Sequence, residues 1–159
     1  MENRSFTTTV FAAQTPGEVF NVIKDVRMWW SGLFDESFEG TFEKVGDEFS
    51  FRAGGGVHIT RQRLVELVPD KKLVWLVTDS NLSFVDTTDE WTRTKISFDI
   101  TEESGRTKIV FTHIGLVPDF ECYESCAPAW TQYICERLPR AIMQTTYCRI
   151  SNNTYLNSN

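Results

Sequence analysis

The sequence has no cluster of basic side chains and no long apolar run. Its 16 Lys and Arg residues are outnumbered by 22 Asp and Glu residues, which gives a formal net charge of −6. Binding to nucleic acid or to an anionic membrane surface needs a basic patch, so both are disfavoured as partners. No apolar run approaches the roughly 20 residues of a transmembrane helix, and residues 1–5 lack the apolar core of a signal peptide. We therefore expect a cytoplasmic protein.

Motifs for metal or phosphate binding are also missing. The chain has two His and four Cys residues but no Cys-x-x-Cys pair, and the Cys residues lie at 122, 126, 135 and 148. Cys122 and Cys126 could lie near His113, but no fourth ligand is evident, so buried reduced thiols are expected instead of a metal site or a nucleophile. The glycines at 54–56 lack the Lys-Ser/Thr of a phosphate-binding loop. We expect no metal and no cofactor.

Apolar residues at every second position predict a series of antiparallel strands. The pattern is clearest at residues 94–101, where a turn then leads into a returning strand. Because no helical pattern interrupts the strands between residues 38 and 113, a parallel sheet is excluded. Strands are expected at residues 6–12, 38–43, 48–52, 57–68, 73–78, 94–101 and 107–113, with a loop or weak edge strand at 80–90.

Two helices are expected at opposite ends of the chain. Thr15 and Glu18 form a capping box, and the apolar face that follows predicts about four turns ending near Trp30. In the C-terminal part, Pro128 suits a helix start near residue 127, and Pro139 predicts a kink. Apolar residues there recur about every 3.6 positions, as in an α-helix. This spacing places seven residues on one face of the helix, namely Tyr123, Ala127, Trp130, Ile134, Leu138, Ala141 and Thr145.

Several motifs together resemble a known superfamily. They are Thr15-Pro16-Gly17-Glu18-Val19-Phe20, Val26-Arg27-Met28-Trp29-Trp30, Val45-Gly46-Asp47-Glu48-Phe49, Glu66-Leu67-Val68-Pro69, Leu73-Val74-Trp75 and Phe111-Thr112-His113-Ile114-Gly115-Leu116. In order and spacing they resemble the START-like SRPBCC superfamily, and within it the branch similar to the C-terminal domain of the activator of the heat-shock chaperone ATPase. The likeness covers about residues 5–145. A single domain at 1–150 is expected, followed by a polar tail at 151–159.

The resemblance implies an α+β helix-grip fold, as in the birch-pollen-allergen-like proteins. A seven-stranded curved antiparallel sheet would wrap around a long C-terminal helix, with a short N-terminal helix after the first strand and an apolar cavity inside. Members of the superfamily include lipid and polyketide binders, cyclases and chaperone co-factors. A fold shared by such different activities implies a pocket and does not imply a reaction.

The abundant aromatic residues are the main candidates for lining that cavity. The chain has five Trp and twelve Phe residues, and rigid rings pack with gaps more readily than short aliphatic side chains do. The alternative, that these rings only fill the core, stays open. The apolar candidates for contact with a ligand are Trp30, Trp75, Trp91, Phe98, Phe111, Trp130 and Ile134.

Two polar residues complete the set of candidates. His113 shares the alternation phase of Phe111, so its imidazole is expected to point inward, where it could act as an acid or base or satisfy one hydrogen bond. Glu90 lies beside Trp91 at the entrance to a predicted strand and could orient one polar end of a ligand. His58 follows the triple glycine and is expected at the surface.

The leading hypothesis is a protein that binds a hydrophobic small molecule, lipid-like or polycyclic, between the C-terminal helix and the sheet. One alternative is a cyclase or hydrolase working in the same cavity, with His113 as its first candidate residue, although no catalytic residue is assigned. Another is a chaperone-linked interaction module. It is disfavoured because the chaperone-activating members carry a separate N-terminal domain that this sequence does not show. A homodimer is left open.

Overall fold

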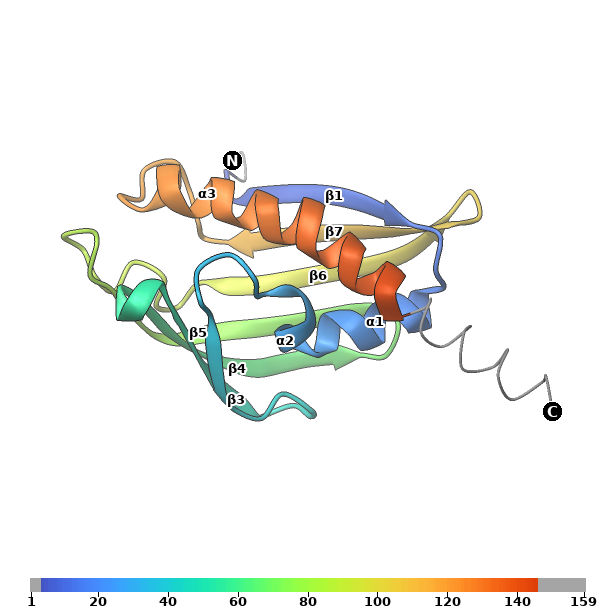
Figure 1. Ribbon diagram of the computed structural model, residues 1–159, viewed down its shortest axis with the longest axis horizontal. Helices are drawn as coiled ribbons and strands as arrows, with labels where there is room; N and C mark the ends of the chain where they lie inside the picture. Colours follow the sequence, from blue (N-terminus) through green and yellow to red (C-terminus); the bar gives the residue numbers. More distant parts are fainter. Residues whose placement is uncertain (1–3, 146–159) are drawn as a thin grey trace.

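The computed structural model describes residues 4–145, which form a curved antiparallel sheet with helices packed against it. The sheet has seven strands in the order β1-β7-β6-β5-β4-β3-β2. Every pair of adjacent strands is consecutive in the sequence except the pair of β1 and β7. The α+β helix-grip architecture expected from the sequence is confirmed (Figure 1). The strands are β1 (Phe6–Ala12), β2 (Ser37–Gly40), β3 (Glu48–Ala53), β4 (His58–Val68), β5 (Lys72–Leu82), β6 (Lys95–Glu103) and β7 (Arg106–Ile114).

The expected N-terminal helix is divided in two at Asp25. Helix α1 (Pro16–Lys24) begins as predicted, because the Thr15 hydroxyl accepts a hydrogen bond from the Glu18 N–H at 3.2 Å. Asp25 then adopts an extended backbone, and its carboxylate accepts a hydrogen bond from the Arg27 N–H to start α2 (Val26–Trp29). The prediction of one continuous helix was wrong here, since Asp25 ends one helix and caps the next.

The C-terminal helix starts earlier than expected and contains a wide turn. Helix α3 (Tyr123–Gln132) has Pro128 in its interior, and the π-helical turn η2 (Tyr133–Arg137) follows it directly. The chain then stays helical to Thr145. Pro139 cannot donate a hydrogen bond to the carbonyl four residues before it, and the backbone just upstream widens so that the Leu138 N–H reaches the Tyr133 carbonyl. The distortion predicted at Pro139 thus lies in the preceding turn.

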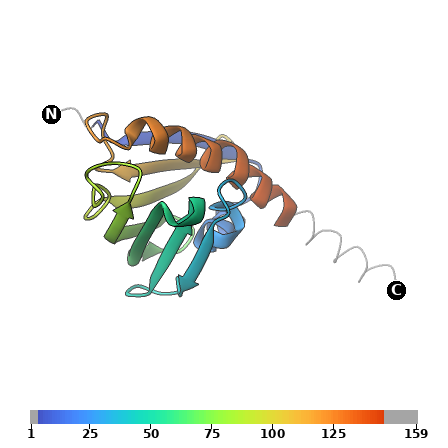
Figure 2. The same ribbon diagram turned by 60° about the vertical axis from the view of Figure 1, so that its left-hand side comes forward.

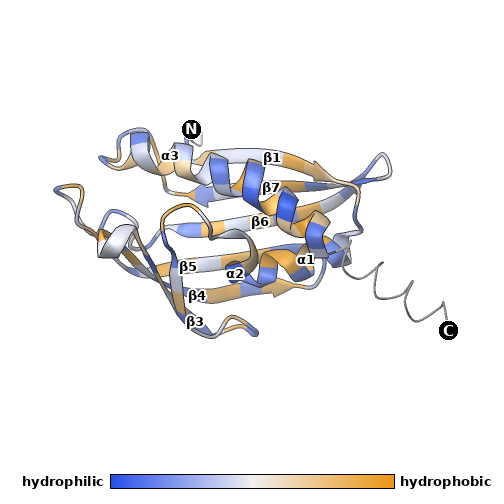
Figure 3. Cartoon of the chain, in the orientation of Figure 1, coloured by the Kyte–Doolittle hydropathy of each residue, from blue (hydrophilic) through white to orange (hydrophobic). Residues whose placement is uncertain are grey.

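This helix runs diagonally across one face of the sheet (Figure 1), and from the side the sheet curls beneath it (Figure 2). Hydrophilic residues recur along its outer side (Figure 3). Between helix and sheet lies a core of fully buried rings, comprising Trp29, Trp30, Trp75, Trp130, Phe49, Phe51, Phe98 and Phe111. The long strand β5 extends to Leu82, so the expected loop at 80–90 begins only after that residue.

Two of the predictions from sequence concern residues that the structure does not describe. Cys148 and the polar tail at 151–159 lie beyond the described residues. Among residues 4–145, no helix is both long enough and apolar enough to span a membrane.

Candidate functional site: an aromatic cavity beneath the C-terminal helix

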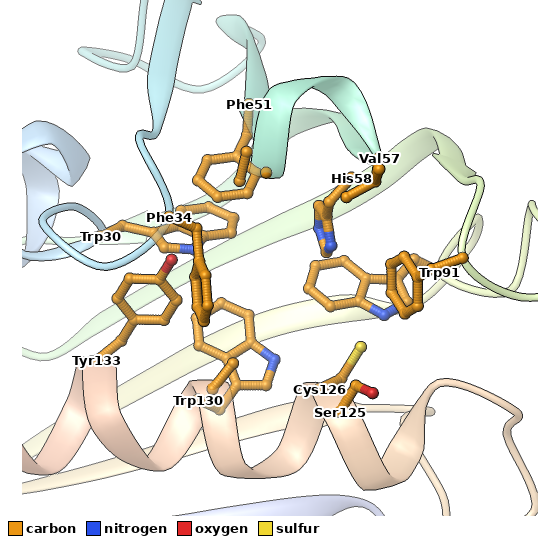
Figure 4. Close-up of a pocket in the computed structure, with 14 residues that line it drawn as sticks. Trp30, Phe34, Phe51, Val57, His58, Trp91, Ser125, Cys126, Trp130 and Tyr133 are labelled. Carbon is orange, nitrogen blue, oxygen red and sulfur yellow. The ribbon is translucent and has the colours of Figure 1, made fainter.

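A cavity of about 220 Å³ opens between α3, η2 and the adjacent ends of β3 and β4. Its walls come from segments far apart in sequence, and Figure 4 shows Trp30 and Tyr133 on one side of it and His58 and Trp91 on the other. Most of the lining is aromatic or aliphatic. The lining residues are Trp30, Phe34, Phe51, Ala53, Gly54, Val57, His58, Phe84, Trp91, Ser125, Cys126, Ala129, Trp130 and Tyr133.

Three large apolar side chains form the mouth of the cavity. Phe34 is 46% exposed, Val57 43% and Phe84 42%. Phe34 packs edge-to-face on Tyr133 with ring centroids 6.4 Å apart, and Phe84 stacks on His58 at 6.3 Å. Each comes from a different connection between elements, and backbone hydrogen bonds join these connections, from the Gly54 N–H to the Phe34 carbonyl at 2.8 Å and from the Ser83 N–H to the Val57 carbonyl at 2.9 Å.

The inner wall is a packed group of tryptophans. Trp130 of α3 lies 5.8 Å from Trp91 in a stacked arrangement and 5.1 Å from Trp30, measured between ring centroids. Trp30 in turn stacks on Phe51 at 4.3 Å. The break at Asp25 helps to position this wall, since it redirects the chain into α2, which ends at Trp30. Rings locked in this way give the cavity a fixed shape on its inner side.

The structure brings some of the sequence candidates to the cavity and leaves others in the core. Trp30, Trp91 and Trp130 line it. The other apolar candidates are fully buried without reaching it, namely Trp75, Phe98, Phe111 and Ile134. Phe111 packs behind Trp130 at 4.6 Å, so the tryptophan separates it from the cavity. Whether any of these residues contacts a ligand stays a prediction.

His113 does point inward, but both of its ring nitrogens are occupied. The Trp130 indole N–H donates to Nδ1 at 3.0 Å, and Nε2 lies 2.7 Å from the Thr94 hydroxyl. That hydroxyl donates to the Trp91 carbonyl, so it must accept from His113 Nε2–H, which defines the neutral tautomer. Burial lowers the pKa of His113 to about 3. This histidine is a satisfied core residue and does not line the cavity.

Glu90 joins two loops instead of lining the cavity. Its carboxylate accepts hydrogen bonds from the N–H groups of Glu121, at 2.7 Å, and Cys122, at 3.0 Å, just before α3 begins. Glu121 reciprocates, because its carboxylate accepts from the N–H groups of Asp86 and Thr87 and from the Thr87 hydroxyl. These hydrogen bonds, above all the one from Thr87, lower the pKa of Glu121. The acidic group at 86–90 thus holds the loop before β6 against the start of α3.

We expect Glu90→Ala to lower the free energy of unfolding by about 1 to 3 kcal/mol, because two N–H groups at the helix start lose a charged acceptor. Urea denaturation monitored by Trp fluorescence measures this difference. Asp89→Ala is the matched control, with an expected change below about 0.5 kcal/mol for an exposed side chain. Equal effects of the two substitutions would contradict the assigned role of Glu90.

His58 is the residue that sequence reasoning placed wrongly. The residue is only partly exposed, and its ring lies among Phe51 at 5.3 Å, Trp91 at 4.6 Å and Phe84. Its Nε2 atom is buried and has no hydrogen-bond partner within the described part of the chain. Burial lowers the pKa of His58 to about 4, so the imidazole is neutral at neutral pH.

The other polar groups of the lining have partners or stay uncharged. The Tyr133 hydroxyl donates to the Glu36 carboxylate at 2.5 Å, and burial together with this contact raises its pKa. The pKa of the Cys126 thiol is raised by its hydrogen bond with Cys122 and by burial. The same hydrogen bond lowers the pKa of Cys122, whose sulfur also accepts from the Trp91 indole N–H at 3.4 Å. In residues 4–145, no cluster of His, Cys, Asp and Glu could hold a metal ion.

Solved structures of several bacterial proteins have the same fold. The solution structure of the Aha1 dimer from Colwellia psychrerythraea is 19% identical, with a TM-score of 0.64 over 82% of this chain and 90% of that one. Protein MLL2253 from Mesorhizobium loti is 21% identical, with a TM-score of 0.65 over 87% of this chain and 98% of that one. A protein from Arthrobacter aurescens reaches a TM-score of 0.67 at 13% identity, over 89% and 87% of the two chains. At these identities the likeness concerns the fold alone.

The family assignment rests on the sequence. No curated protein matches this chain. Residues 13–142, which include both helical regions and six of the strands in full, match the family described as Activator of Hsp90 ATPase homolog 1-like protein. The match covers most of the chain and agrees with the resemblance seen in its motifs. The chain therefore belongs to the Activator of Hsp90 ATPase homolog 1-like family.

Proposed function

We propose that this protein binds a small, largely apolar molecule in the cavity beneath α3. The observation that carries the proposal is the combination of a rigid tryptophan wall with an exposed apolar mouth at Phe34, Val57 and Phe84. Ligand sites are typically concave, mostly apolar and largely pre-formed, with few polar groups. An exposed apolar rim that leads into a buried apolar wall fits that description.

The size of the cavity limits the ligand. Its 220 Å³ is below the roughly 300 to 1,000 Å³ of sites for drug-sized molecules, and above the roughly 150 Å³ of a cavity that holds benzene. A single ring with a short substituent is therefore the best fit. A lipid-like or polycyclic ligand, the expectation from sequence, requires the mouth to widen.

The expected affinity is modest. A ring that loses about 150 to 250 Å² of surface gains about 4 to 6 kcal/mol from burial. Without any cost of association this gain corresponds to dissociation constants between about 1 mM and 40 µM, and association costs weaken binding further, so dissociation constants of about 1 mM or weaker are expected. A natural ligand would bind more tightly if it also made polar contacts.

A cyclase or hydrolase activity has less support. Such chemistry needs at least two polar groups that converge on one bound atom. His113, the first candidate, has both nitrogens occupied behind the tryptophan wall. The Tyr133 hydroxyl is occupied by Glu36. Among the described lining residues, His58 has a ring nitrogen without a hydrogen-bond partner, but that nitrogen is buried, so it does not favour catalysis.

Native mass spectrometry of the purified protein, repeated after denaturing extraction, tests the proposal directly. A co-purifying small molecule would support binding and would identify the ligand class. The proposal fails if the protein carries no small molecule and also binds no small aromatic probe.

Filling the cavity is expected to abolish binding of such a probe. We expect Ala129→Leu, which adds three carbon atoms to a lining position, to weaken toluene binding at least tenfold, because the added volume occupies the space for the ring. Chemical-shift titration of the ¹⁵N-labelled protein measures the affinity. Ala127→Leu makes the same change on the same helix outside the lining and should leave toluene binding within about twofold. Equal weakening by both variants would contradict binding in this cavity.

Assembly stays a separate prediction. The Colwellia structure is described as an Aha1 dimer, which supports testing whether this chain forms a homodimer. Light scattering at several protein concentrations makes that test. A chaperone partner would instead be sought by pull-down from a lysate.

A further inference from the structure

The indole N–H of Trp30 is a hydrogen-bond donor that the protein leaves unused at the cavity. Within residues 4–145 it has no hydrogen-bond partner, and its nitrogen is not among the sealed side-chain atoms that lack one, so it keeps access to the cavity that Trp30 lines. The N–H of Trp75 also lacks a partner, but it is sealed in the core. The other three indole N–H groups donate to protein acceptors, and they belong to Trp29, Trp91 and Trp130.

Rigid neighbours fix the direction in which this donor points. Trp30 ends α2, and its backbone N–H donates to the Val26 carbonyl at 2.9 Å. Phe51 stacks on the indole with centroids 4.3 Å apart, and Trp29 stacks on it at 5.7 Å. The residue is only 1% exposed. Figure 4 shows Trp30 on the same side of the cavity as Tyr133. The free donor is therefore part of the rigid inner wall.

The other polar side chains of the lining do not compete for a polar group of a ligand. The Nε2 atom of His58 is sealed, and its ring lies edge-to-face with Trp91 at 4.6 Å. Ser125 is an exposed residue near the start of α3, where water can hydrate its hydroxyl. The Tyr133 hydroxyl and the Cys126 thiol have hydrogen-bond partners in the protein. A ligand against the inner wall thus meets one unused donor.

An unused donor makes the cavity selective. Water that enters through the mouth can hydrate the Trp30 N–H in the empty cavity, but a ring that fills the cavity displaces it. If the ring is purely apolar, the N–H stays unpaired, which costs more than an ordinary hydrogen bond contributes. An indole N–H only donates, so the matching ligand group is an acceptor.

We propose that the ligand of this cavity is a small neutral aromatic carbonyl compound, such as an aryl ketone, whose oxygen accepts a hydrogen bond from the Trp30 indole N–H. This inference rests on the proposed function and specifies its ligand class. A carbonyl oxygen accepts without bringing a hydrogen that would need an acceptor of its own. The neighbouring Glu36 carboxylate already accepts from the Tyr133 hydroxyl and from backbone N–H groups of the preceding loop.

The charge of the lining favours a neutral ligand. No Lys or Arg is among the lining residues, so a carboxylate would be buried without a counter-ion. The Glu36 carboxylate, bound to Tyr133 of the lining, would also repel an anion placed on this side of the cavity. A ketone satisfies the donor without introducing a charge.

Two compounds of similar shape test the inference. In α-methylstyrene a CH₂ group replaces the carbonyl oxygen of acetophenone, and both consist of one ring with a short substituent. The affinity of each for the full chain is measured by chemical-shift titration in the wild type and in Trp30→Phe, which removes the indole N–H. Trp91→Phe is the matched control, because it makes the same change in the same lining at an indole whose N–H donates to Cys122.

We expect Trp30→Phe to lower the ratio of the association constants, acetophenone over α-methylstyrene, about three- to tenfold, the range of a neutral hydrogen bond. Trp91→Phe should leave this ratio within about twofold of the wild type. The ratio compares two ligands of similar shape in one variant, so changes in cavity volume or stability affect both and largely cancel. Circular dichroism confirms that each variant is folded.

A second readout needs no substitution, so the test stands even if Trp30→Phe fails to fold. An N–H proton that gains a carbonyl acceptor shifts downfield in the NMR spectrum. We expect the indole proton of Trp30 in the ¹⁵N-labelled wild type to move further downfield with acetophenone than with α-methylstyrene. The indole proton of Trp130 keeps its bond to His113 and should respond equally to both compounds.

Other results would overturn the inference. An equal response of the Trp30 proton to both compounds, or an unchanged ratio in Trp30→Phe, would mean that this N–H does not bind the carbonyl. Binding of both compounds would then leave the proposed function standing. Tighter binding of benzoate than of acetophenone to the wild type would contradict a neutral ligand. If neither compound shifts the signals of the lining residues, the proposed function fails and this inference fails with it.

Discussion

Replacing Trp130 by Ala is expected to lower the free energy of unfolding by about 3 to 5 kcal/mol, the usual cost of removing a large ring from a core. Trp130 is 1% exposed and stands where the helix, the cavity wall and the sheet meet. Its ring contacts those of Trp30, Trp91 and Phe111. Its N–H also satisfies His113, so the truncation leaves both a void and an unpaired nitrogen. Urea denaturation at neutral pH measures the loss.

Two further variants make the test informative if Trp130→Ala fails to fold. Trp130→Phe keeps most of the ring but removes the N–H, and its expected cost is about 1 to 3 kcal/mol. Phe84→Ala removes an aromatic ring of the same cavity at its exposed mouth, and its expected cost is below about 1 kcal/mol. If Trp130→Phe were no more destabilising than Phe84→Ala, the hydrogen bond to His113 would have no role in stability.

The elements that sequence reasoning predicted well are those with a local cause. Thr15 and Glu18 cap α1 through contacts within one turn, so the start of that helix was readable from four residues. The hairpin of β6 and β7 follows from strict alternation on both sides of a turn, and it pairs Phe98 with Phe111 as that alternation implies. The antiparallel order followed from the lack of intervening helices.

The break at Asp25 had no such clear signal, because the apolar pattern favours a continuous helix while Asp25 favours a helix cap. The apolar pattern continues through Val26 to Trp30 and favours one helix. In a continuous helix, however, adjacent residues such as Trp29 and Trp30 point about 100° apart. Both are fully buried, with Trp29 donating its indole N–H to the Ile23 carbonyl. The break turns α2, which carries Trp29 and ends at Trp30, to a new direction relative to α1, and Asp25 supplies the caps.

The cavity was predictable only in part for a related reason. Alternation predicts that Trp75 of β5 points inward, but it does not say whether that ring lies in the core or lines the cavity. Trp91, which lines the cavity, lies in the turn before β6, where alternation predicts nothing. Phe34 and Phe84 lie in irregular segments without any periodic signal. His58 did carry one, since it shares the inward phase of Thr60 and Gln62 along β4, but the neighbouring triple glycine favoured a surface interpretation.

Acidification offers a test of both histidines at once. Lowering the pH from 7.5 to 5 is expected to reduce the free energy of unfolding by about 4 kcal/mol, with about 2 kcal/mol from each histidine. Burial lowers the pKa of His58 to about 4 and that of His113 to about 3, against an ordinary value of 6.5. At pH 5 the unfolded chain therefore binds two protons that the folded protein excludes. Stability is present above pH 6.5 and is lost as the pH falls from there toward 4.

Carboxylates cannot explain a loss in this window. The pKa values of Asp47 and Glu121 are lowered by their hydrogen bonds, so the stability that they contribute disappears only at lower pH. Urea denaturation at pH 7.5, 6 and 5 measures the profile. His58→Phe removes one of the two groups and should halve the decrease, while leaving the His113 hydrogen bonds intact. A stability that stays constant between pH 7.5 and 5 would mean that both imidazoles accept protons in the folded protein. In that case water would reach both imidazoles in the folded protein.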